Sequence, residues 1–277
     1  MKRIEQKVRE TIEKYRLINK KDKVLVACSG GKDSTAVLYI LNKLGCNVSA
    51  ITVDALIGNY TKQNLKNIKR FCKEQKIKLH IVSFREEFGY SLCYLKSILA
   101  NKGVKLGSCT ICGVLRRYLL NKYAKKLKAD IITTGHNMDD EAQSVLMNLF
   151  KNDPELLARL GPKTGINNFN KFTPRIKPLY FVSEKEVIEY SRLMKFPVKY
   201  DTCPCRTDAY RNHIRKLLDN YEKKNPDVKK NIIENFLMFL PLLKKKFKSG
   251  KPDYCKNCGE PSKKEKCMAC QILERLK

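Results

Sequence analysis

Residues Val24-Leu-Val-Ala-Cys-Ser-Gly-Gly-Lys-Asp-Ser34 predict a strand, a glycine turn and the start of a helix. The first four residues form a short apolar run, which is typical of a strand covered on both faces. Gly30 and Gly31 let the backbone turn sharply, so that successive N–H groups converge on an anion. Lys32 and the N-terminus of a helix expected over residues 35–44 add positive charge there. The stretch therefore predicts a phosphate-binding loop.

The motif Ser29-Gly-Gly-Lys-Asp-Ser34 does not have the spacing of a Walker loop, in which four residues separate the first glycine from Gly-Lys. It instead resembles the PP-loop of ATP pyrophosphatases, which release pyrophosphate while they adenylate a substrate. Asp33 and Ser34 are candidate caps of the following helix. An ordinary turn between strand and helix is the alternative, but six matching residues in this context favour the PP-loop.

The charge balance indicates a polyanionic partner. Among 277 residues, 57 Lys and Arg oppose 28 Asp and Glu, which gives a formal charge of +29. An enzyme that acts on a small neutral substrate does not need this excess, whereas a nucleic acid would be attracted and held by it. A lysine-rich proteome is the alternative explanation, and we expect nucleic acid.

The twelve cysteines, most of them in close pairs, favour metal or redox chemistry. The segment Met1 to Lys21 is charged throughout and does not resemble a signal peptide, and no apolar run approaches the length of a membrane span. We therefore expect a cytoplasmic protein with no membrane association and no disulfide framework. Four isolated cysteines are expected to fill the core, namely Cys28, Cys46, Cys72 and Cys93.

Predicted strands alternate with predicted helices, which indicates an α/β fold with a doubly wound, Rossmann-like parallel sheet. Strands are expected at residues 24–27, 47–54, 77–84, 129–135 and 175–179. Helices are expected at residues 4–17, 35–44, 59–75, 86–101, 115–127, 139–150, 183–194, 207–222 and 227–247. The expected organisation is an N-terminal helix (1–21), a PP-loop ATP pyrophosphatase domain (22–205), a basic helical region (206–251) and a small terminal module (252–277).

Ligands of such sheets bind beyond the carboxyl ends of the strands, where segments far apart in the chain meet. We expect the nucleotide contacts to be Ala27, Ser29, Gly30, Gly31, Lys32, Asp33, Ser34, Val53, Gly135 and His136. Asp139 and Asp140 follow the fourth expected strand and are candidate Mg²⁺ ligands beside the phosphates of ATP. Acidic capping of a helix N-terminus is the alternative role for one of these carboxylates.

The segments Cys255-Lys-Asn-Cys258 and Cys267-Met-Ala-Cys270 form the strongest metal signal in the chain. Two Cys-x-x-Cys knuckles provide four thiolates for a tetrahedral structural Zn²⁺. A segment this short has no core of its own, so the metal would keep it folded. We therefore predict a terminal zinc ribbon.

The segment Cys109-Thr-Ile-Cys112 supplies two thiols, which fit a redox pair, half of a zinc site or two buried side chains. Cys203 is the candidate third ligand, with Cys205 as an alternative. Three thiolates and a vacant position suit a 4Fe-4S cluster whose fourth iron binds an exogenous sulfur. They also suit Zn²⁺ with a bound water, and the spacing does not choose between the two.

Several motifs together resemble the TtuA/Ncs-type tRNA 2-thiouridine synthetases. They are Ser29-Gly-Gly-Lys-Asp-Ser34, Cys109-Thr-Ile-Cys-Gly113 with Arg116 and Arg117, Gly135-His-Asn-Met-Asp-Asp-Glu141 and Asp201-Thr-Cys-Pro204. The first helix and the terminal cysteine knuckles extend the similarity over nearly the whole chain. The resemblance implies a tRNA sulfurtransferase that uses ATP to adenylate the position-2 carbonyl of a uridine and then replaces its oxygen with sulfur.

The resemblance also implies roles for single residues. Cys109, Cys112 and Cys203 match the ligands of a 4Fe-4S cluster, Asp140 matches an acidic catalytic position near ATP, and Arg116 falls where a catalytic lysine is common. The implied partners are tRNA, gripped by the basic residues 223–251, and a sulfur donor. That donor is a thiocarboxylated ubiquitin-like protein or sulfide.

Three features depart from the family pattern. Met1 opens directly on the first helix, where a further zinc module is usual, so the modified uridine stays open. Arg116 keeps the charge of the usual lysine but changes its geometry, and Cys205 is a thiol where another residue is more common. The alternatives are a 2-thiocytidine synthetase-like enzyme, which typically lacks the ribbon, and a non-catalytic ATP-binding zinc-ribbon protein that binds RNA. The oligomeric state also stays open, with a homodimer as one arrangement.

Overall fold

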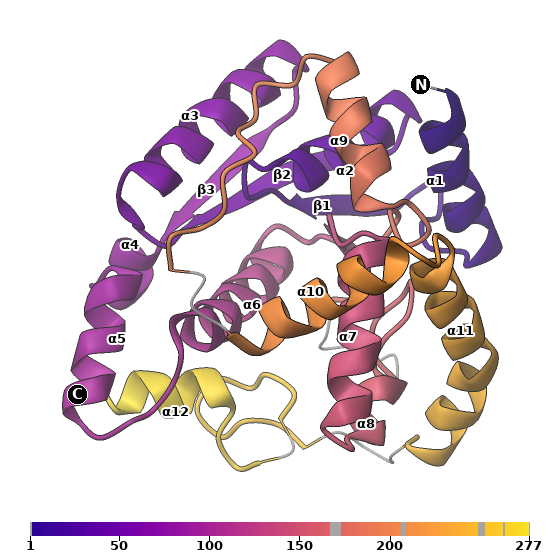
Figure 1. The fold of residues 1–277 in the computed structure, drawn as a ribbon. Helices are drawn as coiled ribbons and strands as arrows, with labels where there is room; N and C mark the ends of the chain where they lie inside the picture. The colour runs from indigo at the N-terminus through magenta and orange to yellow at the C-terminus, as the bar shows by residue number, and fades with distance from the viewer. Residues whose placement is uncertain (1, 167–172, 206–208, 249–252, 263, 277) are drawn as a thin grey trace.

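Five parallel strands form a single sheet in the order β3-β2-β1-β4-β5, with helices on both faces (Figure 1). The computed structural model describes residues 2–166, 173–205, 209–248, 253–262 and 264–276. The strands are β1 (Lys23–Ala27), β2 (Asn47–Asp54), β3 (Leu79–Ser83), β4 (Ile131–Thr134) and β5 (Arg175–Ile176). This order reverses direction at β1, which confirms the predicted doubly wound sheet and places a ligand-binding crevice at the carboxyl ends of β1 and β4.

The helices follow the predicted ranges closely, apart from a last helix in the terminal module that was not predicted and three further differences. They are α1 (Lys2–Lys14), α2 (Lys32–Lys43), α3 (Gly58–Glu74), α4 (Phe84–Phe88), α5 (Leu92–Asn101), α6 (Ser108–Lys126), α7 (Met138–Phe150), α8 (Pro154–Ala158), α9 (Glu184–Leu193), α10 (Ala209–Glu222), α11 (Val228–Lys246) and α12 (Met268–Glu274). The expected helix 86–101 is divided because Gly89 adopts φ +81°. The α8 helix was not predicted, and α6 starts seven residues before the expected 115, so that Cys109 and Cys112 belong to its first two turns.

The two faces of the sheet carry separate cores, which explains the continuous apolar run in β1. Val24 and Val26 pack with α1, α2, α3 and α9 on one face. Leu25, between them in the sequence, packs with α5, α6 and α12 on the other. Because side chains alternate along a strand, a strand buried on both faces must be apolar at every position. The same pattern therefore identified β1 from the sequence.

The α10 and α11 helices pack against α7, which carries the acidic segment after β4 (Figure 1). The buried Lys229 of α11 joins these three helices. Its ammonium lies 2.6 Å from a carboxylate oxygen of Asp139, 2.8 Å from Asp219 and 2.9 Å from Glu222. Lys229 is thus unavailable to RNA, which corrects its place in the predicted basic surface, while Lys251 lies outside the described residues.

The isolated cysteines behave as predicted with one exception. Cys28 and Cys72 are buried in the core and Cys46 packs against it, whereas Cys93 is exposed on α5. Cys93 was expected to be core because its helix is apolar overall, but it falls on the solvent side of that helix. Within the described residues, none of the helices combines the length and the apolar character that crossing a membrane requires.

Candidate functional site

The phosphate-binding loop closes on itself through its two serines. The backbone N–H of Ser29 donates to Ser34 Oγ at 3.2 Å, and that hydroxyl donates to the carbonyl of Gly31 at 3.1 Å. The α2 helix begins at Lys32 with Gly31 as its N-cap, and no side chain caps it. The prediction that Asp33 and Ser34 cap this helix was therefore wrong, since both lie in its first turn. The Ser34 side chain instead forms a hydrogen bond within the loop, and the Asp33 side chain accepts one from the segment after β4.

Two glycines let other segments approach this loop closely. Gly30 has φ +81°, and a Cβ atom on it would lie 2.4 Å from the backbone oxygen of Asn64 in α3. A Cβ atom on Gly135, at the end of β4, would lie 2.7 Å from the backbone nitrogen of Ser34. Both positions exclude any side chain, because contacts under about 3 Å force the backbone apart. The predicted meeting of the loop with Gly135 is thus confirmed.

An ion-pair network surrounds the loop lysine. Lys32 Nζ lies 2.9 Å from a carboxylate oxygen of Asp33 and 2.9 Å from one of Glu184, the first residue of α9. Arg215 of α10 pairs with the other oxygen of Glu184. Burial alone would lower the pKa of Lys32, but the two carboxylates outweigh it and raise that pKa. The raised pKa keeps the lysine charged.

The two candidate Mg²⁺ ligands occupy different surroundings. Asp139 accepts from the Lys229 ammonium at 2.6 Å and from the Glu184 N–H at 2.7 Å, so it serves the packing of the helices. Asp140 forms a capping box with Asn137 and lies 3.7 Å from a guanidinium nitrogen of Arg211. Burial raises the pKa of Asp140. Of the pair, Asp139 is thus engaged by Lys229, whereas Asp140 interacts electrostatically with Lys32 of the loop, so the role of both as metal ligands stays a prediction.

The nucleotide contacts predicted after β4 are anchored to the loop by Asn137. Its side-chain amide donates to Asp33 Oδ1 at 2.9 Å. His136 next to it is exposed, and its Nδ1 lies 2.9 Å from the hydroxyl of Thr134. Ala27, the last residue of β1, is half-buried below the loop. The loop, β4 and α7 therefore form one polar group around the start of α2.

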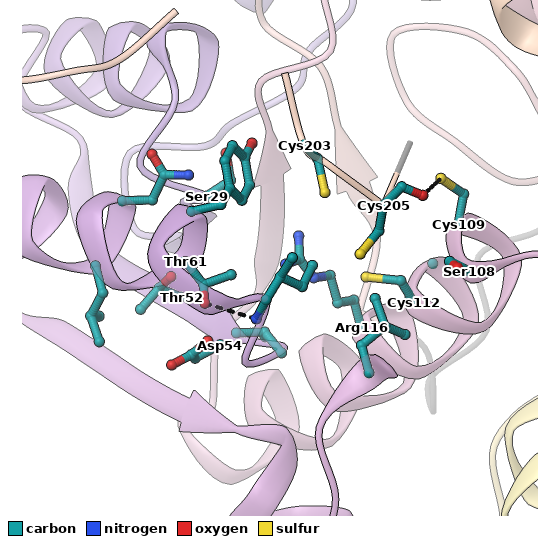
Figure 2. A pocket seen from close by; sticks show the side chains of 17 residues that line it. Ser29, Thr52, Asp54, Thr61, Ser108, Cys109, Cys112, Arg116, Cys203 and Cys205 are labelled. Carbon is teal, nitrogen blue, oxygen red and sulfur yellow. Dashed lines mark hydrogen bonds between the residues drawn. The ribbon is translucent and has the colours of Figure 1, made fainter. Parts of the chain in front are cut away.

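A pocket of about 240 Å³ leads from this loop to the cysteines (Figure 2). Its lining comes from the ends of β1 and β2, from α3, α5 and α6, and from the segment before α10. The predicted site residues in the lining are Ser29, Val53, Cys109, Cys112, Arg116 and Cys203. The remaining loop residues, Gly135, His136 and Asp140 lie outside it. Ser29 is thus the predicted residue that belongs to both the loop and the pocket.

The three predicted cluster cysteines share this pocket although 91 residues separate Cys112 from Cys203. Their thiols do not all approach one another within 4.8 Å, unlike the four terminal thiols. Burial raises the pKa of Cys112, and the nearby Arg116 opposes this rise. Among the described residues, no acceptor pairs with the buried Nε of Arg116. The pocket therefore combines the three predicted ligand thiols with a cation that has unused hydrogen-bonding capacity.

The terminal cysteines form a separate, compact metal site. All four thiols of Cys255, Cys258, Cys267 and Cys270 lie within 4.8 Å of one another, and the Sγ atoms of Cys258 and Cys267 are 3.7 Å apart. Tetrahedral Zn²⁺ with bonds of about 2.3 Å requires sulfurs about 3.8 Å apart, so the donor set fits the predicted ion. The α12 helix docks this ribbon on α6.

Comparison with known proteins identifies relatives that match almost the whole chain. A family model described as the PP-loop domain matches residues 1–221. The tRNA-5-methyluridine(54) 2-sulfurtransferase of Pyrococcus horikoshii is 34% identical over 97% of this chain and 84% of its own length. Cytoplasmic tRNA 2-thiolation protein 1 of Drosophila ananassae is 35% identical over 98% of this chain and 79% of its own.

A solved structure agrees over almost the whole chain. U34-tRNA thiolase NcsA from Methanococcus maripaludis, determined with its 4Fe-4S cluster, matches with a TM-score of 0.82 and 32% identity, covering 99% of this chain and 87% of that one. This chain belongs to the TtuA/Ncs-type family of tRNA 2-thiolation proteins. The predicted family and PP-loop fold are both confirmed.

Several residues of this thiolation-family site were not predicted from the sequence. Tyr60 and Asn64 of α3 line the pocket, and Glu184 and Arg215 surround Lys32. The spacing of Tyr60 and Asn64 put them on one face of α3, but nothing marked that face as part of a site. Glu184 appeared only as part of a capped helix start, because its partner Lys32 lies 152 residues away.

Replacing Glu184 by glutamine is expected to tighten ATP binding by this family member about fivefold, since one part-buried ion pair is worth about 1 kcal/mol. The ATP phosphates must compete with the Glu184 carboxylate for Lys32, and the amide removes that competitor. Calorimetric titration with ATP measures the change. The matched control is Glu74→Gln, whose exposed pair with Arg70 lies on the surface of α3. Unchanged or weaker ATP binding by Glu184→Gln would contradict the role of this pair.

Removal of the metal by a chelator is expected to unfold residues 253–276 and leave the sheet intact. The ribbon has few core side chains of its own, and metal binding to four thiolates supplies about 10 kcal/mol or more of folding free energy in such modules. Hydrogen exchange followed by mass spectrometry should show loss of protection in α12 with unchanged protection in β1. Retained protection in α12 after complete metal removal would show that docking on α6 alone keeps the ribbon folded.

Proposed function

We propose that this chain is an ATP-dependent tRNA sulfurtransferase that adenylates the position-2 carbonyl of a uridine and replaces its oxygen with sulfur. The observation that carries the proposal is the pocket that starts at Ser29 of the PP-loop and ends at Cys109, Cys112 and Cys203. An activated carbonyl and a sulfur nucleophile must meet in one cavity, because the adenylate otherwise reacts with water. The names of the relatives support tRNA as the substrate.

The loop residues would hold ATP for adenylation. The N-terminus of α2 and the Lys32 ammonium face the phosphates, and Asp33 and Asp140 would hold Mg²⁺ between them. These charges stabilise pyrophosphate as it leaves. Adenylation turns a poor leaving group, the carbonyl oxygen, into a phosphate ester oxygen that leaves as AMP. Arg215 and Arg211 from α10 add positive charge near the same groups.

The three pocket cysteines would hold a 4Fe-4S cluster. Thiols too far apart to surround a single ion suit a group that offers each of them a different metal atom. When bound, the cluster supplies an iron that can present an inorganic sulfur. Arg116 lines the same pocket, and its buried Nε–H has no acceptor among the described residues, so it would orient the uridine oxygen or the phosphate of the adenylate.

The tRNA would lie across α10 and α11. Exposed lysines on and beside these helices include Lys216, Lys223, Lys224, Lys230, Lys245, Lys246 and Lys248. Such side chains bind a phosphate backbone without reading its sequence. The relatives act at different uridines, U34 and 5-methyluridine 54, and the position in this case is a matter for experiment. A cytoplasmic location, a homodimer, and sulfide or a thiocarboxylated protein as sulfur donor stay predictions.

The test is nucleoside mass spectrometry of tRNA incubated anaerobically with the iron-loaded protein, ATP, Mg²⁺ and sulfide. We expect ATP-dependent 2-thiouridine or 5-methyl-2-thiouridine, and pyrophosphate release that tRNA stimulates. Asp33→Ala should lose both, whereas Glu74→Gln on the far surface of α3 should keep both. Formation of 2-thiocytidine would identify the other PP-loop chemistry, and unmodified tRNA with intact cluster and ATP binding would contradict the proposal.

A further inference from the structure

A fourth cysteine lies in the same pocket as the three predicted cluster ligands. Cys205 contributes to the lining together with Cys109, Cys112 and Cys203. The family resemblance assigns it no role. Four thiols in one pocket are one more than an open cluster requires, so the fourth one calls for a chemical explanation.

The backbone places Cys205 against the helix that carries the other ligands. The Cys109 thiol donates to the carbonyl oxygen of Cys205 at 3.6 Å, and the Cys205 side chain points toward Cys112 (Figure 2). Only Pro204 separates Cys205 from Cys203. If Cys203 binds the cluster, a second thiol therefore lies only two residues away in the same segment.

Another cysteine lies near Cys205 outside the pocket. Cys93, exposed on α5, lies near the Cys205 side chain. Cys93 is not part of the pocket lining. The Cys205 side chain thus lies near Cys112, a half-buried ligand of the proposed cluster, and near an exposed cysteine outside the pocket.

We infer that Cys205 is a fourth and exchangeable ligand, which binds the iron left open by Cys109, Cys112 and Cys203 until an inorganic sulfur displaces it. The inference rests on the proposed function, because it requires the cluster. The exchange involves no oxidation: the Cys205 thiol releases a proton to water as its sulfur binds iron, and takes a proton back when hydrosulfide takes its place. Meanwhile the capped iron is protected from loss.

The test compares how fast the cluster loses its fourth iron. Wild-type protein, Cys205→Ala and Cys205→Ser are loaded with iron and sulfide anaerobically, freed of excess sulfide and treated with ferricyanide. Conversion to a 3Fe-4S cluster is followed by electron paramagnetic resonance. We expect conversion about tenfold faster in both variants than in the wild type, in the range by which removal of a metal-supporting group weakens metal sites. Added hydrosulfide should abolish the difference, since it occupies the same iron.

Cys93→Ser is the matched control, because it removes a thiol that lies near Cys205 but outside the pocket lining. It should convert at the wild-type rate or more slowly. Equal rates in the wild type and both Cys205 variants would overturn the inference and leave the proposed function intact. A disulfide between Cys93 and Cys205 in the loaded wild-type protein, seen by peptide mass spectrometry, would also overturn it. Wild-type protein that binds no iron at all would contradict the proposed function itself.

Discussion

Replacing Cys112 by serine is expected to reduce tRNA thiolation by at least about a hundredfold, the upper end of the loss seen when metal sites lose a supporting group. Cys112 lies half-buried in the pocket, on the same helix as Cys109 and opposite Cys203. A hydroxyl is a poor ligand for iron, and the remaining two thiols of the predicted set cannot hold a cluster firmly. Iron content, visible absorption and thiolated nucleosides should fall together.

The control for this variant is Cys46→Ser, which changes a half-buried thiol at the edge of the other core. It should retain iron and activity. ATP binding should survive in Cys112→Ser, because the PP-loop is formed by Ser29 and the start of α2 without any contribution from Cys112. Full iron content in Cys112→Ser would mean that the cluster ligands are assigned wrongly.

Replacing Gly30 by alanine is expected to destabilise the protein by about 2–4 kcal/mol and to weaken ATP binding at least about tenfold. The new Cβ atom would lie 2.4 Å from the carbonyl oxygen of Asn64, which is backbone and cannot rotate away. Relief requires α3 to move from the loop or the loop to move from the phosphates. Thermal unfolding and calorimetric ATP titration measure the two effects.

Gly45→Ala separates the two causes of this loss. Gly45 has φ +77°, almost the same as the +81° of Gly30, but a Cβ atom there would meet nothing within 4 Å. Its cost is therefore the left-handed conformation alone, about 1 kcal/mol, and ATP binding should not change. If both variants lose the same stability and both bind ATP normally, the close approach of α3 to the loop does not matter for the site.

The parts of this protein that were predictable are those with a local cause. The β1 strand was predictable because a strand buried on both faces must be apolar at every position. The start of α9 was predictable because Ser183 and Glu186 have the spacing of a capping box. The terminal ribbon was predictable from its two Cys-x-x-Cys knuckles, because the two ligands of each knuckle are close in the chain and a local turn brings them together in space. Errors arose where a second local arrangement was available, as when Gly31 capped α2 in place of Asp33 or Ser34.

The sequence by itself determined the phosphate loop and the ribbon, because each depends on residue types within one short segment. It also determined the parallel sheet and the family, because the order of strands, helices and motifs along the chain indicates them. Only the tertiary structure decided which distant residues contact these features. It joined Lys32 to Glu184 across 152 residues, brought Cys205 beside Cys109 across 96, and assigned Asp139 to a buried lysine. The physical reason is that such contacts depend on the order of the strands and the packing of the helices. Both are determined by the whole core, and the spacing of residues within one segment does not indicate them.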